Sequence, residues 1–415
     1  MRLLLAALTA LAVADAAPLP YMRLLLAALA ALAVADAAPH CVADSPLLSG
    51  NRIRVTLLPG QRTFTLHLPA AMSPAAVVLA VHGAFQNSSI FLDGPSGPSV
   101  GAMDAAFAAA GWVTIAPDAM VNEALTAVNN ATNNTGVATV WGDTAVQHDH
   151  GFGVQQGIAS VDDLAFIWDA LTCVRDTLSV RLTGDVLAFG FSQGAKLASR
   201  VGCATPAPGF TVKAVVASSG LFASPPDAPV CDGSRPPPPL LALQAINDLV
   251  VPFCVPGQVY AEGALYWGVW AGTFNGCSVQ PGTAASTAGL LMVPESPALC
   301  NASRQVAGAT AFLRAYVPGA GCSAPQVLVV VDEGETLGHK LAGPMVGLGG
   351  RDAVTLATQF FQAQLEAASN ASVAERLSFL TAGLTPCATT AGECAVEAPP
   401  PPPPQQPHRH FFDTL

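Results

Sequence analysis

The sequence predicts an α/β protein built on a doubly wound, mostly parallel sheet. Two patterns point to this fold class. Short runs that are apolar throughout recur along the chain, as is typical of strands buried on both faces. Several of these runs are separated by segments whose apolar residues recur at helical spacing. Alternating strands and helices are typical of parallel pairing, because each helix carries the chain back across the sheet.

The first 37 residues are predicted to be a secretory signal peptide, present as a duplicated copy. Residues 1–18 and 22–39 are identical at all but one position, and each copy holds one arginine, a short apolar core and a small-x-small site. We therefore expect a secreted, extracellular protein whose mature chain begins near Ala38. Translation from Met22 is one explanation of the duplication.

Composition excludes some classes of partner. The chain of 415 residues carries a formal net charge of −11, so we expect no basic surface for phosphates and no nucleic-acid partner. Beyond the N-terminus there is no uninterrupted apolar run of about 20 residues, so we expect no stable membrane insertion. The length suits one large domain or two ordinary ones.

The cysteines and glycosylation triplets fit an exported protein. The ten cysteines are even in number, and none forms a Cys-x-x-Cys pair, which disfavours zinc ribbons and thioredoxin-like redox sites. With an export signal they predict up to five disulfide bonds, although a few buried free thiols would leave the same pattern. Five Asn-x-Ser/Thr triplets predict a glycoprotein. They begin at Asn87, Asn130, Asn133, Asn301 and Asn370.

The predicted catalytic domain spans residues 38–384. It starts with a hairpin of two strands of alternating polarity, residues 53–58 and 63–68, followed by buried strands over 75–81 and 112–116. Residues 122–157 are polar and rich in Asn and Gly, and they are expected to be a long surface excursion.

The second half of the domain begins with a helix over about 161–171, for which Ser160 is the expected N-cap. Further buried strands are expected over 186–189, 212–217, 240–245 and 326–331. Residues 256–324 are irregular and contain several cysteines, which predicts a disulfide-stapled cap insertion. Asp352 is the expected N-cap of the last helix, and residues 385–415 form a Pro-rich C-terminal extension.

A Gly-x-Ser-x-Gly motif at residues 190–194 joins a buried strand to a helical pattern. Glycines two residues to either side of Ser192 let the two backbones approach closely, while the serine adopts a strained conformation. This arrangement is the nucleophile elbow of serine hydrolases with the α/β-hydrolase fold. We therefore expect Ser192 to present its hydroxyl at a cleft above the sheet.

A serine nucleophile needs a base, and the base needs an orienting acid. In this fold they follow in the order Ser, Asp or Glu, His. Asp248, directly after a buried strand, is the predicted acid, with a turn-forming residue as the alternative interpretation; Asp332 and Glu333 rank second. His339 follows the last strand and is the only histidine between Ser192 and the tail, so it is the predicted base.

An oxyanion site needs backbone N–H groups aimed at the developing negative charge. The predicted donors are Gln193, directly after the nucleophile, and Ala84, in the loop after an early strand. His82 is expected to be a structural loop residue. The His148-Asp149-His150 run has residue types that bind metals but no third ligand at a recognisable spacing, so we expect no metal and no cofactor.

Several segments follow the pattern of one family in the same order. They are residues 79–86 (LAVHGAFQ), 161–167 (VDDLAFI), 190–194 (GFSQG), 248–253 (DLVVPF), 270–277 (WAGTFNGC) and 338–339 (GH). Together they resemble the polyhydroxybutyrate depolymerase and feruloyl esterase-like family of secreted α/β-hydrolases, over roughly residues 53–365.

The resemblance implies the α/β-hydrolase fold, with Ser192 as nucleophile, Asp248 as acid and His339 as base. It also implies Ala84 and Gln193 as oxyanion donors. The chain departs from the family in two places. The family often has cysteine at the position of Ala84, and it often has Trp-Pro shortly after the histidine, where this chain has Leu-Ala.

These observations predict a secreted serine carboxylic-ester hydrolase that acts on extracellular feruloyl-type polysaccharide esters or on polyhydroxyalkanoate polyester. Within the same chemistry, the alternative is a cutinase- or lipase-like carboxylesterase acting on aliphatic esters. An alternative of another class is a non-catalytic binding or adhesion protein with the α/β-hydrolase fold.

Overall fold

The computed structural model describes the chain in segments. They are residues 40–44, 51–58, 60–71, 73–93, 103–121, 139–141, 161–220, 237–245, 311–316, 326–332 and 351–367, with the single residues 126, 248, 324, 339, 341, 376 and 379. For residues 311–316 and most of 326–332 the description concerns the backbone. The predicted signal peptide, most of the predicted cap and the Pro-rich extension lie outside the described residues.

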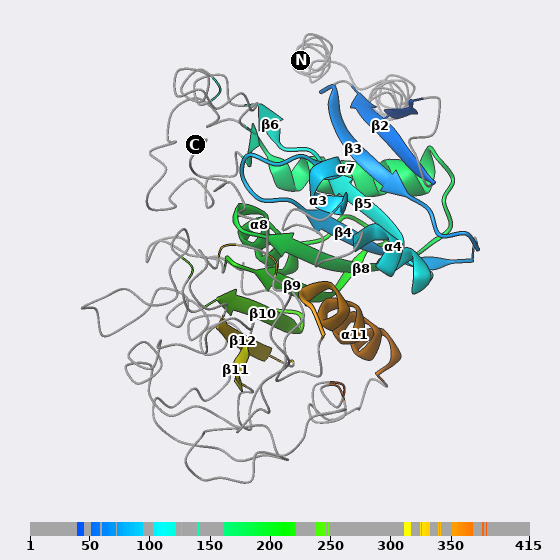
Figure 1. Ribbon diagram of the computed structural model, residues 1–415. Helices are drawn as coiled ribbons and strands as arrows, with labels where there is room; N and C mark the ends of the chain where they lie inside the picture. The colour runs from blue at the N-terminus through cyan, green and yellow to red at the C-terminus, as the bar shows by residue number, and fades with distance from the viewer. Residues whose placement is uncertain are drawn as a thin grey trace, which may run out of the picture.

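Ten strands of the described chain form one sheet, in the order β1-β2-β3-β5-β4-β8-β9-β10-β12-β11 (Figure 1). In chain order they are β1 (His40–Ala43), β2 (Arg52–Leu58), β3 (Arg62–His67), β4 (Ala75–Val81), β5 (Val113–Pro117), β8 (Leu182–Phe191), β9 (Thr211–Ser218), β10 (Leu240–Ala245), β11 (Ala311–Tyr316) and β12 (Gln326–Asp332). Each buried strand expected from an apolar run lies within one of these elements or within a residue of its bounds.

The centre of the sheet is parallel and its two edges are antiparallel. Strands β5, β4, β8, β9, β10 and β12 pair in parallel with one another, in that order. The hairpin β2–β3 and strand β1 add antiparallel pairs on one side, and β11 adds one on the other. The predicted α/β-hydrolase fold is confirmed by this arrangement.

Helices cover both faces of the sheet, as a doubly wound topology requires. Helices α7 (Asp163–Asp176) and α8 (Gln193–Cys203) pack on one face, while α3 (Ser88–Asp93), α4 (Met103–Ala109) and α11 (Ala353–Glu366) pack on the other. The position of strand β4 between the two layers of helices explains why its sequence is apolar throughout. Its residues alternate between the two cores, so both of its faces are buried.

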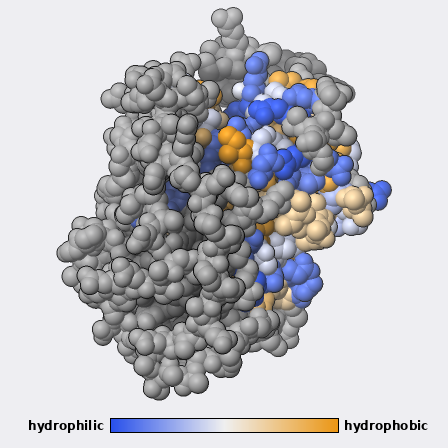
Figure 2. Space-filling model, in the orientation of Figure 1, coloured by the Kyte–Doolittle hydropathy of each residue, from blue (hydrophilic) through white to orange (hydrophobic). Residues whose placement is uncertain are grey.

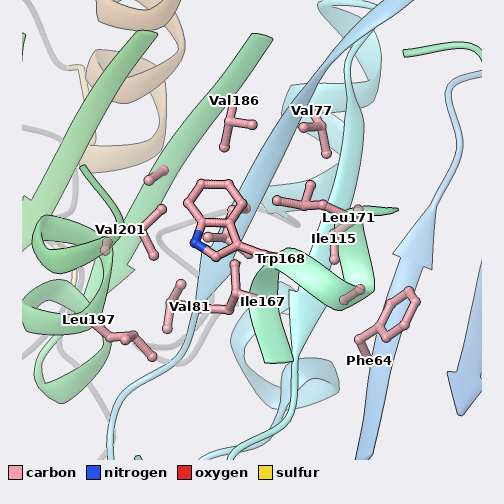
Figure 3. Packing of buried hydrophobic residues seen from close by; sticks show 14 of the residues in the cluster. Phe64, Val77, Val81, Ile115, Ile167, Trp168, Leu171, Val186, Leu197 and Val201 are labelled. Atoms are coloured by element: carbon pink, nitrogen blue, oxygen red, sulfur yellow. The ribbon is translucent and has the colours of Figure 1, made fainter. Parts of the chain in front are cut away.

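The first of these cores lies under α7 and α8. Trp168 and Ile167 of α7 and Leu197 of α8 meet Val81 and Val186 of the sheet (Figure 3). Buried residues therefore recur at helical spacing along the helices and occupy consecutive positions along the central strands. The apolar residues of the sequence follow the same two patterns.

The N-cap of α7 is Asp162, so the expectation of Ser160 was wrong. The Asp162 carboxylate accepts a hydrogen bond from the backbone N–H of Ala165 at 2.9 Å. An aspartate at this position satisfies an otherwise unpaired donor and places a negative charge at the positive end of the helix dipole. At the last helix the expectation was correct, since Asp352 accepts from the N–H of Thr355 at 2.7 Å.

Part of the segment expected to be a cap belongs to the sheet. Residues 311–316 form β11, which pairs antiparallel with β12 and ends the sheet at that edge. The backbone N–H and C=O groups along one side of β11 are satisfied by pairing with β12. The irregular composition of the surrounding sequence gives no sign of this strand.

The surface excursion expected over residues 122–157 contains a strand that pairs with the strand just before it. Strands β6 (Met120–Val121) and β7 (Thr139–Val140) form a separate two-stranded ribbon, and Trp141, directly after β7, is buried. Since Trp141 is one of the largest fully buried side chains among the described residues, this segment contributes to the interior as well as to the surface.

Hydrophilic residues predominate in the described part of the surface shown in Figure 2, with a few hydrophobic residues between them. Ile90, Met120 and Val121 are among the large apolar side chains that are exposed. Within the described segments, no helix has the length and apolar character needed to cross a bilayer.

Candidate active site

Ser192 lies at the sharp turn between β8 and α8, as the motif predicts. Its backbone φ is +55° and its ψ is −124°, a region that residues with a side chain rarely adopt. The Ser192 N–H donates to the carbonyl of Ser218 at 2.8 Å, which ties the turn to the end of β9. The turn therefore projects the serine from the carboxyl end of β8.

The glycines of the motif are required by close backbone contacts. A Cβ at Gly190 would collide with the carbonyl of Gly194, and a Cβ at Gly194 would collide with the carbonyls of Val81 and His82. Gly190 therefore lets the helix start directly over the strand, and Gly194 lets the helix lie against the end of β4.

The three predicted side chains converge above the carboxyl edge of the sheet. The Nε2 atom of His339 lies 2.9 Å from Oγ of Ser192, and its Nδ1 atom lies 2.8 Å and 3.0 Å from the two carboxylate oxygens of Asp248. The fold thus brings His339 within hydrogen-bonding distance of two residues that lie 91 and 147 positions earlier in the sequence.

The hydrogen bonds define the tautomer of His339. A carboxylate only accepts, so Nδ1 carries the proton and donates it to Asp248, which leaves Nε2 free to accept from the Ser192 hydroxyl. The Asp248 side chain is fully buried and that of His339 is 14% exposed. The ring of Phe191 lies 5.2 Å from the imidazole, centre to centre, and packs against it.

Among the described side chains, the carboxylate bonded to this histidine is the first-ranked acid. That acid is Asp248, which lies past the end of β10; Asp332 ends β12, and Glu333 lies outside the described residues. Gln244 of β10 also donates to Asp248, at 3.4 Å, so the carboxylate is oriented from its own strand.

Two backbone N–H groups flank the serine. Among the described residues, those of Ala84 and Gln193 make no hydrogen bond. Gln193 follows Ser192 directly. Ala84 is next to Gly83, where a Cβ would lie 3.0 Å from Cβ of Ser192, so this loop runs alongside the nucleophile. Backbone donors near the serine that have no partner among the described residues are what an oxyanion site needs.

His82 is a structural residue, as expected. The N–H of Ala119 donates to its Nε2 at 3.1 Å, so Nδ1 carries the proton and donates to the carbonyl of Gly83 at 2.7 Å. Burial lowers the pKa of His82 to about 4, against the smaller effects of the Gly83 hydrogen bond and of Asp118. The ring is therefore neutral near pH 7, and neither nitrogen is free to act as a base.

Trp141 and Thr139 contact the site, although no motif in the sequence points to them. The indole N–H of Trp141 donates to the carbonyl of His82 at 2.8 Å, and its backbone N–H donates to the side-chain oxygen of Gln193 at 3.1 Å. The carbonyl of Thr139 accepts from the N–H of Phe85 at 2.9 Å. A tryptophan in a polar, Asn-rich segment is the one sequence signal that could have drawn attention to this strand.

Arg62 of β3 is a largely buried cation close to Trp141. Its guanidinium lies 3.7 Å from the ring centre of Phe166 and 6.0 Å from that of Trp141, and it forms an ion pair with Asp163 at 2.7 Å. Burial lowers the pKa of Arg62 below its ordinary value, and the charge of Asp163 counteracts this effect. The cation thus has a carboxylate and two aromatic faces as partners.

Other expected residues could not be placed. The His148-Asp149-His150 run lies outside the described residues, as do four of the five glycosylation triplets, and no group of three potential metal ligands occurs in the part of the chain described. Asn87 is exposed, and its side chain accepts from the N–H of Ile90 at the start of α3.

One disulfide bond joins described residues. It links Cys41 of β1 to Cys173 of α7. Cys203 is also disulfide-bonded, and there are no free thiols among the cysteines of the described segments. These observations agree with the expectation of disulfide bonds, although the remaining pairings lie outside the described residues.

No protein-family model matches the sequence, and no curated protein matches it. Solved structures match parts of it. Acetyl xylan esterase from Aspergillus awamori is 13% identical over 70% of this chain and 92% of its own, with a TM-score of 0.38. The poly(3-hydroxybutyrate) depolymerase LpqC from Bordetella parapertussis is 14% identical over 55% and 71%, with a TM-score of 0.30. A lipase in its open form is 19% identical over 43% of each chain, with a TM-score of 0.24. Similarity at this level does not identify the activity of this protein.

Proposed function

We propose that this protein is a serine carboxylic-ester hydrolase in which Ser192 is the nucleophile, His339 the base and Asp248 the orienting acid. The observation that carries the proposal is the continuous relay from the Ser192 hydroxyl through the imidazole to the buried carboxylate. Seating a base at 2.9 Å from a serine in a strained turn is useful for nucleophilic catalysis, whereas a binding protein has no need of it.

The reaction follows from the tautomer. Nε2 of His339 takes the proton of Ser192 as Oγ attacks the ester carbonyl, and Asp248 stabilises the imidazolium that forms. The N–H groups of Ala84 and Gln193 would hold the tetrahedral oxyanion. Collapse expels the alcohol, which receives the proton from His339. Water, activated by the same base, then attacks the acyl-enzyme and releases the acid and the free serine.

The substrate class we propose is an extracellular ester, either a feruloyl-type ester on polysaccharide or a polyhydroxyalkanoate. Two features support the extracellular location: the duplicated N-terminal signal motif and the disulfide bonds, which form in oxidising compartments. Comparing rates on methyl ferulate, polyhydroxybutyrate and C4 to C8 acyl esters separates this class from a cutinase- or lipase-like preference.

The test of the chemistry is Ser192→Ala, assayed with a short p-nitrophenyl ester. Removing the nucleophile should reduce kcat by about 10⁶-fold while the fold is retained, because Ser192 makes its structural contacts through the backbone. Ser199→Ala is the matched control: Ser199 is also buried on α8, but its hydroxyl bonds the Ala195 carbonyl within the helix, so kcat should be unchanged.

Labelling with a serine-directed phosphonate distinguishes the remaining alternative. A non-catalytic binding protein with this fold would not react, whereas the proposed enzyme should be labelled on Ser192. The Ser192→Ala variant should not be labelled. Unchanged ester turnover in Ser192→Ala would refute the proposal.

A further inference from the structure

The two candidate oxyanion donors come from segments far apart in the sequence. Ala84 is in the loop after β4, and Gln193 begins α8. A useful oxyanion site requires both N–H groups to point to one spot, with tolerances of a fraction of an ångström. Something in the fold must therefore set the spacing between the loop and the helix.

The conformation of the Ala84 loop depends on contacts from within the loop and from outside it. Phe85 has a φ of +63°, a left-handed conformation that is unfavourable for a non-glycine residue and persists only where neighbouring contacts enforce it. One enforcing contact lies within the loop, where the Gln86 side chain accepts from the N–H of Gly83 at 3.0 Å. The others come from outside it.

Those outside contacts come largely from residues 139–141, here called the β7 clamp. The Trp141 indole donates to the His82 carbonyl, the Thr139 carbonyl accepts from Phe85 N–H, and the Thr139 hydroxyl donates to the Gln86 carbonyl. Ala84 is thus flanked on both sides by residues bonded to the clamp, while its own N–H has no partner among the described residues.

The β7 clamp also reaches the second donor. The backbone N–H of Trp141 donates to the side-chain oxygen of Gln193 at 3.1 Å. One residue therefore bonds the loop through its indole and the helix start through its main chain. The clamp itself is backed by Arg62, whose guanidinium lies 6.0 Å from the Trp141 ring, and is paired with β6 on its other side.

We propose that Trp141 is a positioning residue that sets the distance between the Ala84 and Gln193 N–H groups, with Thr139 holding the conformation of the loop. The inference rests on the proposed ester hydrolysis. It predicts that damage to the β7 clamp weakens stabilisation of the transition state without altering the Ser192–His339–Asp248 relay.

Trp141→Phe is the first test, because it removes the indole N–H and retains an aromatic ring. We expect kcat on a p-nitrophenyl ester, per active site titrated with phosphonate, to fall by about 10- to 100-fold with KM nearly unchanged. The pH profile of kcat/KM should keep the wild-type midpoint, because His339 and Asp248 are untouched. A purely structural role would lower the titrated fraction of active protein, not kcat per site.

Trp112→Phe is the matched control. Trp112 is also buried, but it packs against Phe107 and Phe361 just before β5 begins, at the amino edge of the sheet and away from the site. The same chemical change there should lower stability and leave kcat per site at the wild-type value.

A second pair of variants tests the loop independently and decides the matter if Trp141→Phe does not fold. Thr139→Val removes the hydroxyl at constant shape and should lower kcat several-fold, while Thr139→Ser keeps the hydroxyl and should restore it. Wild-type kcat in Trp141→Phe overturns the proposal, as does wild-type kcat in Thr139→Val where Trp141→Phe does not fold, or a shifted pH midpoint. A wild-type protein that hydrolyses no ester refutes the proposed function instead, and this inference with it.

Discussion

Ser192 shows how a single residue can be held in an unfavourable conformation by its neighbours. A left-handed φ of +55° costs of the order of 1–3 kcal/mol at a residue with a side chain. The hydrogen bond to Ser218 holds the turn in this conformation. The missing side chains at Gly190, Gly194 and Gly220 leave room for it; a Cβ at Gly220, for example, would collide with the Ser192 carbonyl. The strain places Oγ where His339 can reach it.

At the same scale, Asp248→Asn should separate orientation from nucleophilicity. An amide can present its N–H₂ group to Nδ1 of His339, which forces the proton onto Nε2 and prevents it from accepting from Ser192. We expect kcat to fall by about 10³- to 10⁴-fold with the fold retained, measured on a p-nitrophenyl ester and by thermal unfolding.

Asp104→Asn is the matched control for this substitution. Asp104 is another buried carboxylate, on α4, where it pairs with Arg52 and lies 2.7 Å from Nδ1 of His67. Its loss should lower stability without changing kcat per active site. An Asp248→Asn enzyme within tenfold of the wild type would contradict the role proposed for Asp248.

Between elements, a few polar and covalent contacts attach the antiparallel edge to the rest of the fold. Arg52 at the start of β2 forms ion pairs with Asp93 at the end of α3 and with Asp104 of α4. Burial alone raises the pKa of Asp104, but the contacts with His67 and Arg52 outweigh it and lower the pKa to about 2. On the opposite face the Cys41–Cys173 bond attaches β1 to α7.

The double variant Cys41→Ala, Cys173→Ala tests the covalent attachment. The bond closes a loop of 132 residues, so its loss should lower the free energy of unfolding by about 2–5 kcal/mol, chiefly by freeing the unfolded chain. Urea denaturation measures this change. Because the site lies away from β1, kcat should not change. Hydrogen exchange should show β1 opening first, and an unaltered urea midpoint would show that the bond adds no stability.

At the scale of the whole molecule, the parallel centre of the sheet explains why the site exists. Strands β4, β8, β10 and β12 run in the same direction, so their carboxyl ends lie along one edge. The loop of Ala84 follows β4, Ser192 follows β8, Asp248 follows β10 and His339 follows β12. Open parallel sheets place their ligand sites at this edge.

Acid should destabilise the molecule through His82. Its pKa is about 4 in the folded protein and ordinarily 6.5, so between these values the unfolded chain binds more protons than the folded one. Stability is therefore full above pH 6.5 and is lost as pH falls toward 4, by roughly 3 kcal/mol at about 1.4 kcal/mol per pKa unit. Below pH 4 the lowered pKa of Asp104 acts in the same direction.

Urea unfolding of the wild type and of His82→Gln at pH 4 to 7 measures this effect. The glutamine has no proton to gain in this range, so the variant should be less stable at pH 7 but should show a flatter pH dependence. Equal slopes for the two proteins would mean that other groups control the acid response.

Much of the fold and the three relay residues could be predicted from the sequence. Strand β4 is apolar in every position because both faces are buried, and this burial leaves a pattern within seven consecutive residues. The elbow is likewise local, since Gly190 and Gly194 are needed within the same turn as Ser192. Asp248 and His339 could be found because parallel strands place the residues that follow them at one edge.

Only the tertiary structure decided what surrounds the relay. Trp141 acts on His82 and Gln193, each more than fifty residues away, and nothing in its own segment records those contacts. The same holds for Arg62 behind it, for β11 at the edge of the sheet and for the pairing of Cys41 with Cys173. Burial and turn geometry leave periodic or adjacent patterns in a sequence, whereas a contact between distant segments depends on the packing of the folded chain.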